Sequence, residues 1–203
     1  MKTICTAAGL TMLAAFAIAP AFAQQPPTST RAKGVIESFD GSTLALKPEN
    51  GADMTIKLTD NAAVFGVEPA KIADIKIGDF IAVGATPQPD GSQKAIVVNI
   101  FAESMRGIGE GFRPWDRPNT TMTNATVDST VAGTDGQVVT VKYKDGSQKI
   151  VIGPDAAIRV YVPSDKSELK SGAHIAMPRI EKLPDGTLQT ARIYVGRSGV
   201  VPQ

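Results

Sequence analysis

Residues 35–58 read VIESFDGSTLALKPENGADMTIKL, and this stretch decides the fold. Apolar and polar residues alternate on both sides of Asp40-Gly41 and Asn50-Gly51. Asp-Gly and Asn-Gly between alternating runs are strong signals for β-hairpins, because these residues tolerate positive φ. The stretch therefore predicts three short antiparallel strands with one buried face.

The chain around this stretch extends the pattern into a unit that covers residues 32–101. After a short apolar piece at 62–67, Pro69 stands at a plausible first helical position, and a Gly-containing corner follows at 75–79. Two further strands are expected at 80–85 and 95–101, with a turn between them at 89–91. One unit thus has five or six short strands and a single helical turn.

The same pattern returns in the second half of the chain. Three turns recur at a spacing of 95 residues: Asp40-Gly41, Asn50-Gly51 and Asp90-Gly91 return as Asp135-Gly136, Asp145-Gly146 and Asp185-Gly186. This repeat predicts an internal duplication. We expect an all-β fold of two small OB-like β-barrels, five or six strands each, joined by an irregular connector and packed on each other. One larger sandwich built from both copies is the alternative.

The N-terminus has the form of a secretory signal peptide. A short positive start precedes an apolar run at 4–18, and Ala21-Phe22-Ala23 fits the cleavage rule. A membrane anchor is the alternative, but the run is shorter than the ~20 residues that a span requires, and Pro20 interrupts it. We expect export to a Gram-negative periplasm, or secretion. The expected organisation is a signal peptide at 1–23, a flexible tail at 24–31, repeat 1 at 32–101, a connector at 102–123, repeat 2 at 124–197 and a C-terminal tail at 198–203.

Composition narrows the function classes. The chain has 21 Lys and Arg against 20 Asp and Glu, and its single Cys, Cys5, lies in the leader. After cleavage the charges balance, which gives no support for nucleic-acid binding. The mature chain would have no thiol for disulfides or catalysis, and no segment after residue 23 is apolar enough to span a bilayer.

The polar residues give no clear catalytic or metal site. The Asp residues that precede Gly are accounted for by turn chemistry. His174 is the only His and has no Cys or second His to complete a metal site. Met105 and Met122 are soft ligands, but Met more often fills gaps in a core. We expect no metal, cofactor or catalytic residue, with a carboxylate-dependent hydrolase as the least favoured alternative.

The connector contains the most unusual run, Arg113-Pro114-Trp115-Asp116-Arg117-Pro118, which includes the only Trp. A long connector in a compact protein is usually functional or disordered, and this composition argues against disorder. Trp115 between Arg side chains suits stacking on a sugar or an aromatic ligand. The favoured alternative is that Trp115 fills the seam between the barrels while Asp116 pairs with an Arg. The candidate residues for ligand or partner binding are Arg106, Arg113, Trp115, Asp116 and Arg117.

Several segments resemble a small β-barrel domain of exported bacterial proteins, domain of unknown function 5666: residues 34–41 (GVIESFDG), 75–84 (IKIGDFIAVG) and 89–95 (PDGSQKA). Residues 109–116 (GEGFRPWD) and 121–127 (TMTNATV) resemble a two-copy subgroup, some of whose members carry the label "metal ABC transporter permease". That subgroup has His at the position of Phe112, so the resemblance implies no metal role for Phe112. It implies a small-barrel fold and export, and it carries no established catalytic residues.

Together these patterns predict an exported, non-catalytic β-barrel protein that acts as a binding or envelope-associated module. Its partner would be an envelope protein or a small ligand. The alternative is a small-ligand binding accessory protein, for a sugar or a metal ion. The sequence leaves the oligomeric state open.

Overall fold

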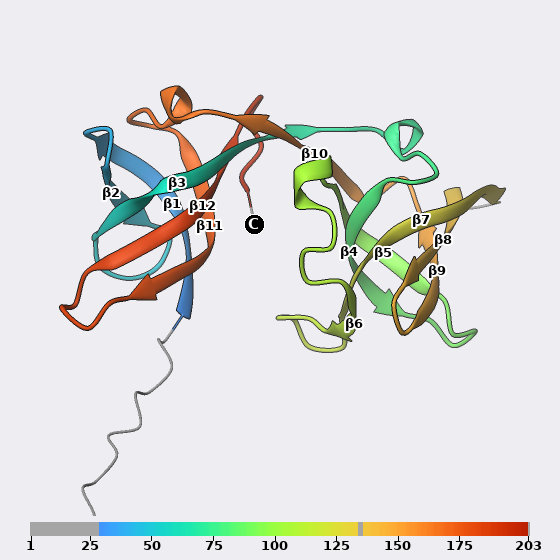
Figure 1. Ribbon diagram of the computed structural model, residues 1–203. Helices are drawn as coiled ribbons and strands as arrows, with labels where there is room; N and C mark the ends of the chain where they lie inside the picture. Colours follow the sequence, from blue (N-terminus) through green and yellow to red (C-terminus); the bar gives the residue numbers. More distant parts are fainter. Residues whose placement is uncertain (1–28, 134–135, 203) are drawn as a thin grey trace, which may run out of the picture.

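The computed structural model describes residues 29–133 and 136–202 (Figure 1). The expected signal peptide at 1–23 and most of the expected tail at 24–31 lie outside these residues. The described chain is all-β, as predicted, with three short 3-10 turns. The strands are β1 (Ser29–Phe39), β2 (Thr43–Pro48), β3 (Met54–Pro69), β4 (Phe80–Pro87), β5 (Gln93–Ile100), β6 (Gly111–Pro114), β7 (Thr121–Gly133), β8 (Gly136–Tyr143), β9 (Gly146–Ile152), β10 (Ala157–Ser164), β11 (His174–Lys182) and β12 (Leu188–Gly196). The turns are η1 (Ile72–Asp74), η2 (Glu103–Met105) and η3 (Lys166–Glu168).

Turn chemistry explains the hairpins, as the sequence predicted. The Asp40 carboxylate accepts hydrogen bonds from the backbone N–H groups of Ser42 and Thr43, at 2.8 and 2.7 Å. These donors, Ser42 first, hold the pKa of Asp40 below its ordinary value. Asp90 and Asp185 accept backbone hydrogen bonds in the same way. The Asp residues of these turns therefore fix chain reversals.

Five strands close a barrel, which we call ring 1. The pairings run β11–β1–β2–β3–β12 and return to β11. All the pairs are antiparallel except β12–β3, which is parallel. The inward side chains form one apolar core, whose main members are Ile36, Leu44, Leu46, Ile56, Met177, Ile180, Ile193 and Val195. Ring 1 thus combines strands from both ends of the chain.

The other lobe has a second circuit of pairings, which we call ring 2. It runs β7–β4–β5–β9–β8 and returns to β7. The link between β5 and β9 is short and parallel, with Gln93 opposite Ile150 and Lys94 opposite Val151. A separate apolar core fills this lobe, with Ile81, Val83, Val98, Val127, Val139, Val141, Ile150 and Ile152 among its members. Figure 1 shows ring 1 and ring 2 as two lobes that β3 and β10 connect.

The composition of the rings differs from the expectation that 32–101 and 124–197 each form a barrel. β1 pairs with β11 and β3 pairs with β12, whereas β4 pairs with β7 and β5 pairs with β9. The physical reason lies in β3, which continues through the apolar residues 62–67 instead of turning back. Its second half pairs with β10, from Val64 opposite Ser164 to Pro69 opposite Arg159. The chain therefore leaves ring 1 along β3 and enters ring 2.

A third apolar cluster lies where the lobes meet, and we call it the seam. Its buried members are Phe65, Val67, Met105, Tyr161, Ala176 and Tyr194. Aromatic rings run through it: the Tyr161 ring lies edge-on to those of Tyr194 and Phe101, at centroid distances of 4.9 and 5.2 Å. Each such pair adds about 0.5–1.5 kcal/mol beyond the burial of its area. The seam holds the two lobes against each other.

Candidate functional site

The expected connector, 102–123, is largely ordered. It contains η2 and the short strand β6, which pairs with β7. β7 already begins at Thr121, so regular structure starts three residues before the expected second repeat. Met105 anchors η2 because its side chain is fully buried in the seam. The residue that fills the seam is thus Met105, whereas Trp115 lies elsewhere.

Trp115 packs on ring 2. A Cβ added to Gly84 in β4 would lie 2.5 Å from Cζ3 of Trp115, so glycine is required for the ring to lie this close. The backbone N–H of Trp115 donates to the Thr120 carbonyl at 3.0 Å, and the Arg117 guanidinium carbon lies 5.1 Å from the centroid of the Trp115 ring. The Trp115 side chain is half-buried. This side chain packs the connector against β4 and makes a cation–π contact with Arg117.

Asp116 links the connector to the other lobe. Its carboxylate accepts a hydrogen bond from Arg31 in β1 at 2.7 Å. Both side chains are about 70% exposed, so this ion pair contributes little to stability. It does hold the loop that carries Trp115 and Arg117 close to ring 1. The prediction that Asp116 pairs with an Arg is confirmed.

The other two predicted residues have separate contacts. Arg106 forms two hydrogen bonds of 2.6 Å with Glu103 and one of 2.9 Å with the Gly78 carbonyl. The hydrogen bond from Arg106 holds the pKa of Glu103 below its ordinary value. Arg113 donates to the Gly109 carbonyl at 2.7 Å. The structure therefore brings Trp115, Asp116 and Arg117 together in one loop, while Arg106 and Arg113 stabilise the connector itself.

Sequence reasoning missed two arginines on the strands beside the seam. Arg159 in β10 lies opposite Asn99, and Arg192 in β12 lies opposite Ala63. Arg159 Nη1 and Arg192 Nε are buried without a hydrogen-bond partner among the described residues. Within residues 29–133 and 136–202, neither arginine forms an ion pair. The sequence feature that could have identified these two residues is a cation within the alternating pattern of a predicted strand.

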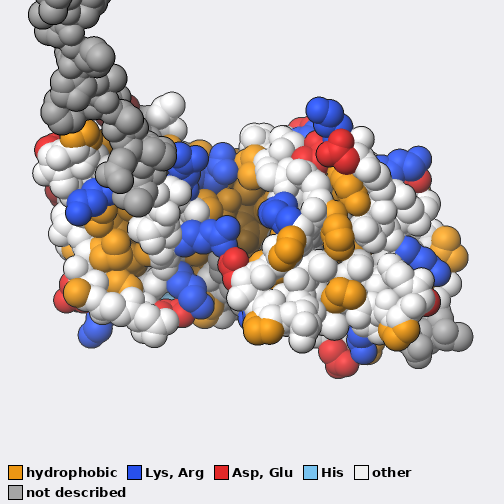
Figure 2. Space-filling model, turned by 90° about the horizontal axis from the view of Figure 1, so that it is seen from below, with side chains coloured by type: hydrophobic (Ala, Val, Ile, Leu, Met, Phe, Trp, Pro, Cys, Tyr) orange, Lys and Arg blue, Asp and Glu red, His pale blue; other side chains and the backbone are white. Residues whose placement is uncertain are grey.

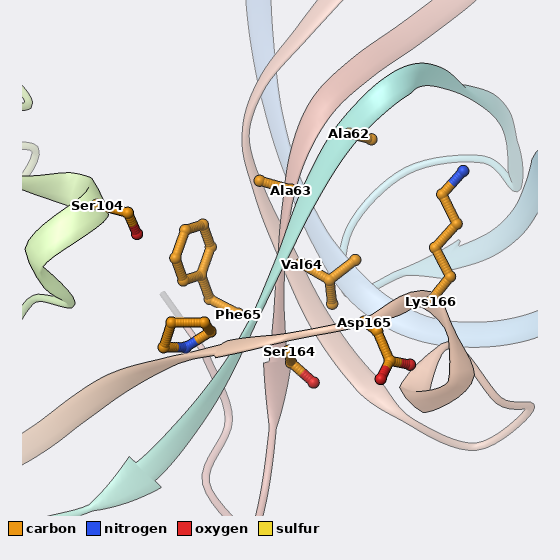
Figure 3. A pocket seen from close by; sticks show the side chains of 9 residues that line it. Ala62, Ala63, Val64, Phe65, Ser104, Ser164, Asp165 and Lys166 are labelled. Carbon is orange, nitrogen blue, oxygen red and sulfur yellow. The ribbon is translucent and has the colours of Figure 1, made fainter.

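A pocket of about 370 Å³ opens where β10 separates from β3 (Figure 3). Ser104 approaches from η2, opposite Phe65, and its hydroxyl points toward the strands. Two of the pocket's polar groups already have partners: Ser164 donates to Glu168 at 2.5 Å, and Asp165 accepts from the backbone N–H of Ser167 at 2.7 Å. The pocket therefore offers mainly apolar surface, the Ser104 hydroxyl and the Lys166 side chain.

His174, the only His of the chain, lies exposed on β11 opposite Val35. Among the described residues, no group of three or more His, Cys, Asp or Glu side chains is placed to hold a metal ion. The part of the chain that the structure covers also has no helix of the length and apolarity that a membrane span requires. Comparisons with protein-family models, with curated proteins and with solved structures found no match to this chain.

Proposed function

We propose that this protein is an exported, non-catalytic binding module whose binding surface is the space between the two lobes. The observation that carries this proposal is a hollow between ring 1 and ring 2 (Figure 2). Apolar side chains line the hollow, and Lys and Arg side chains gather on its ring 1 side. Concave, largely apolar surfaces with a few polar groups are the usual form of ligand sites.

The connector supports this assignment by its position. The Asp116–Arg31 ion pair joins the connector to β1, so the loop that carries Trp115 and Arg117 extends from ring 2 toward ring 1. This loop presents an aromatic ring and a guanidinium group beside the space between the lobes. We assign Trp115, Asp116 and Arg117 to the rim of the binding surface, and Arg106 and Arg113 to the support of the connector.

We further propose that the two lobes arose by duplication and exchanged strands. The registers support this proposal. Val64 of β3 pairs with Ile193 of β12 in ring 1, and Ile158 of β10 pairs with Val98 of β5, beside ring 2. Ile158 follows Val64 by 94 residues, and Ile193 follows Val98 by 95. The core positions correspond as well: Leu44 with Val139, Leu46 with Val141, Ile56 with Ile150, Leu58 with Ile152, Ile175 with Ile81 and Met177 with Val83.

Membership of the exported small-barrel family, domain of unknown function 5666, is part of the same proposal. Its support is the set of sequence segments quoted above, together with the all-β fold. The periplasm is the proposed location, because the sequence of residues 1–23 has the form of a cleavable signal peptide. A small-ligand accessory role is the second candidate, and the pocket beside Phe65 and Ser104 favours it.

Native mass spectrometry of the mature protein, purified from its own cell envelope, tests the proposed function. We expect a reproducible extra mass that denaturation removes, or a second protein at fixed stoichiometry. Variants Trp115→Ala and Arg117→Ala should lower the occupancy, whereas Lys142→Ala, on the far hairpin of ring 2, should not. A bare chain in every preparation, with no partner after chemical crosslinking in the envelope, would overturn the proposal.

A further inference from the structure

Arg192 and Tyr194 project from the same face of β12, away from the core of ring 1. Ile193, which lies between them in the sequence, and Val195, which follows Tyr194, are buried in that core. A bulge between Thr190 and Arg192 shifts the register of β12 against β3. The Thr190 hydroxyl donates to the Arg179 carbonyl at 2.8 Å and holds this bulge in place. Bulges commonly redirect a side chain at functional sites, and this one directs Arg192 outward beside Tyr194.

Arg192 is a partly buried cation that lacks a counter-ion among the described residues. Its Nε has no hydrogen-bond partner there although it is buried. Burying a charged donor without a partner is costly, and a charge-assisted hydrogen bond to an oxyanion would offset that cost. The Arg192 side chain interacts with the Tyr194 hydroxyl, and a bound carboxylate or phosphate would add the charged partner that the described residues do not supply.

The surroundings of Arg192 also suit an anion. Burial raises the pKa of Tyr194, so its hydroxyl stays protonated and can donate a hydrogen bond. Lys33 lies in the same cross-strand row, opposite Ala176, which in turn lies opposite Tyr194. The one acid in contact with Lys33 is Glu49, at 2.7 Å. Figure 2 shows Lys and Arg side chains on the ring 1 side of the hollow between the lobes.

The corresponding place in ring 2 indicates the shape of the ligand. Val97, 95 residues before Arg192, is apolar and buried. It lies opposite Gly84, on which the Trp115 ring packs. In ring 2, the Trp115 ring of the connector covers this place, which has an apolar residue and no cation. In ring 1, Arg192 stands at the place of Val97 and Pro178 at the place of Gly84, and Tyr194 follows Arg192 on the same face of β12.

We infer that the face of ring 1 formed by Arg192, Tyr194 and Lys33 binds a small ligand that carries a carboxylate or phosphate on a flat apolar body. Arg192 and Lys33 hold the oxyanion, and Tyr194 adds a hydroxyl donor. The flat body lies beside Arg192, on the face of ring 1 that corresponds to the face of ring 2 on which Trp115 packs. This inference rests on the proposed binding function and names the chemistry of its ligand.

Isothermal titration calorimetry of the mature chain tests the inference with four probes: benzoate, phenyl phosphate, inorganic phosphate and benzyl alcohol. We expect benzoate or phenyl phosphate to bind, and benzyl alcohol and inorganic phosphate to bind at least tenfold more weakly. Arg192→Gln should weaken binding about tenfold or more, because it removes the charge-assisted hydrogen bond to the oxyanion. Arg192→Lys should restore part of the affinity. Arg179→Gln is the matched control, because Arg179 is an exposed arginine on β11 that pairs with Glu181, and it should bind as the parent does.

Thermal melting of each variant separates loss of the site from loss of the fold. Equal binding of benzyl alcohol and benzoate, unchanged binding in a folded Arg192→Gln variant, or no binding of either aromatic anion would overturn the inference. These outcomes differ from failure of the proposed function. A neutral ligand or a protein partner in native mass spectra would keep the binding module and remove only the anion site.

Discussion

Val67 and Tyr161 lie opposite each other in the antiparallel ladder that joins β3 to β10, at the crossing between the lobes. Both side chains are buried in the seam. Tyr161 is also 94 residues after Val67, so the ladder pairs each of these positions with its own counterpart in the proposed repeat. The stability of the crossing therefore depends on this pair and on the aromatic rings around it.

Replacement of Tyr161 by Ala should destabilise the whole chain. The side chain is 3% exposed and contacts aromatic rings of both lobes, and truncating a buried aromatic residue typically costs about 3–5 kcal/mol. Urea denaturation should show a loss of that order in one transition for both lobes. Tyr161→Phe, which keeps the ring, is the matched control and should cost much less. An early, separate transition of one lobe in Tyr161→Ala would contradict a shared seam.

Cleavage of the chain in the connector should leave the molecule assembled. Each ring takes strands from both sides of the connector, so the two fragments stay joined through six strand pairings and the seam. A protease site inserted after Gly107, which is exposed, allows the cut after folding. Size-exclusion chromatography should show one species of unchanged size before and after cleavage. Two separate folded fragments would indicate that each half closes its own ring.

Local signals were sufficient to predict the strands and turns but not how the rings close. Asp40 and Asp90 fix their turns through contacts within three residues, and such contacts can be inferred from sequence. Whether β3 returns to its own unit or crosses to β10 depends on pairings between residues about a hundred positions apart. Because both units present the same edges, the local pattern is equally compatible with both arrangements.

The candidate site was predicted only in part for the same reason. The Arg and Trp run identified the loop of Trp115, Asp116 and Arg117, because its composition is unusual. It did not reveal that Trp115 packs on Gly84, since that contact brings the loop after β6 against β4 and depends on how the connector folds. Arg192 has an ordinary outward position in an alternating strand. Only the bulge and its buried Nε distinguish it from a surface arginine.

A side chain at Gly84 should displace Trp115. The Cβ of Gly84→Ala would lie within 2.9 Å of three ring carbons, which forces the indole away from β4 into water. Since Trp115 is the only Trp, its fluorescence maximum should move to longer wavelength. Ala85→Ser, at the next position, is the control and should leave the emission unchanged because Ala85 faces the core of ring 2. Unaltered emission in a folded Gly84→Ala variant would refute this packing.

Trp115→Ala should lower the free energy of unfolding by about 1–2 kcal/mol, because the ring is half-buried.

The tail after β12 should stabilise the chain in a pH-dependent way. Arg197 packs across Gly66 and donates to Glu168 Oε2 at 3.0 Å and to Glu68 at 2.5 Å. The hydrogen bond from Arg197 is the main reason that the pKa of Glu168 lies below its ordinary value. The folded chain therefore binds this proton less tightly than the unfolded chain. The contribution is fully present above the unfolded pKa of about 4.3 and disappears as the pH falls through the lower folded pKa.

Glu168→Gln should accordingly lower the melting temperature by a few degrees at pH 7, and the difference from the parent should shrink between about pH 5 and pH 3. The Glu168 and Arg197 side chains are 28% and 31% exposed, so we expect about 1–2 kcal/mol after allowance for solvent screening. Glu103→Gln is the control, because Glu103 also pairs with an arginine but is 77% exposed, and it should change the melting temperature less. A Glu168→Gln difference that stays constant from pH 7 to pH 3 would show that the carboxylate does not stabilise the tail through its charge.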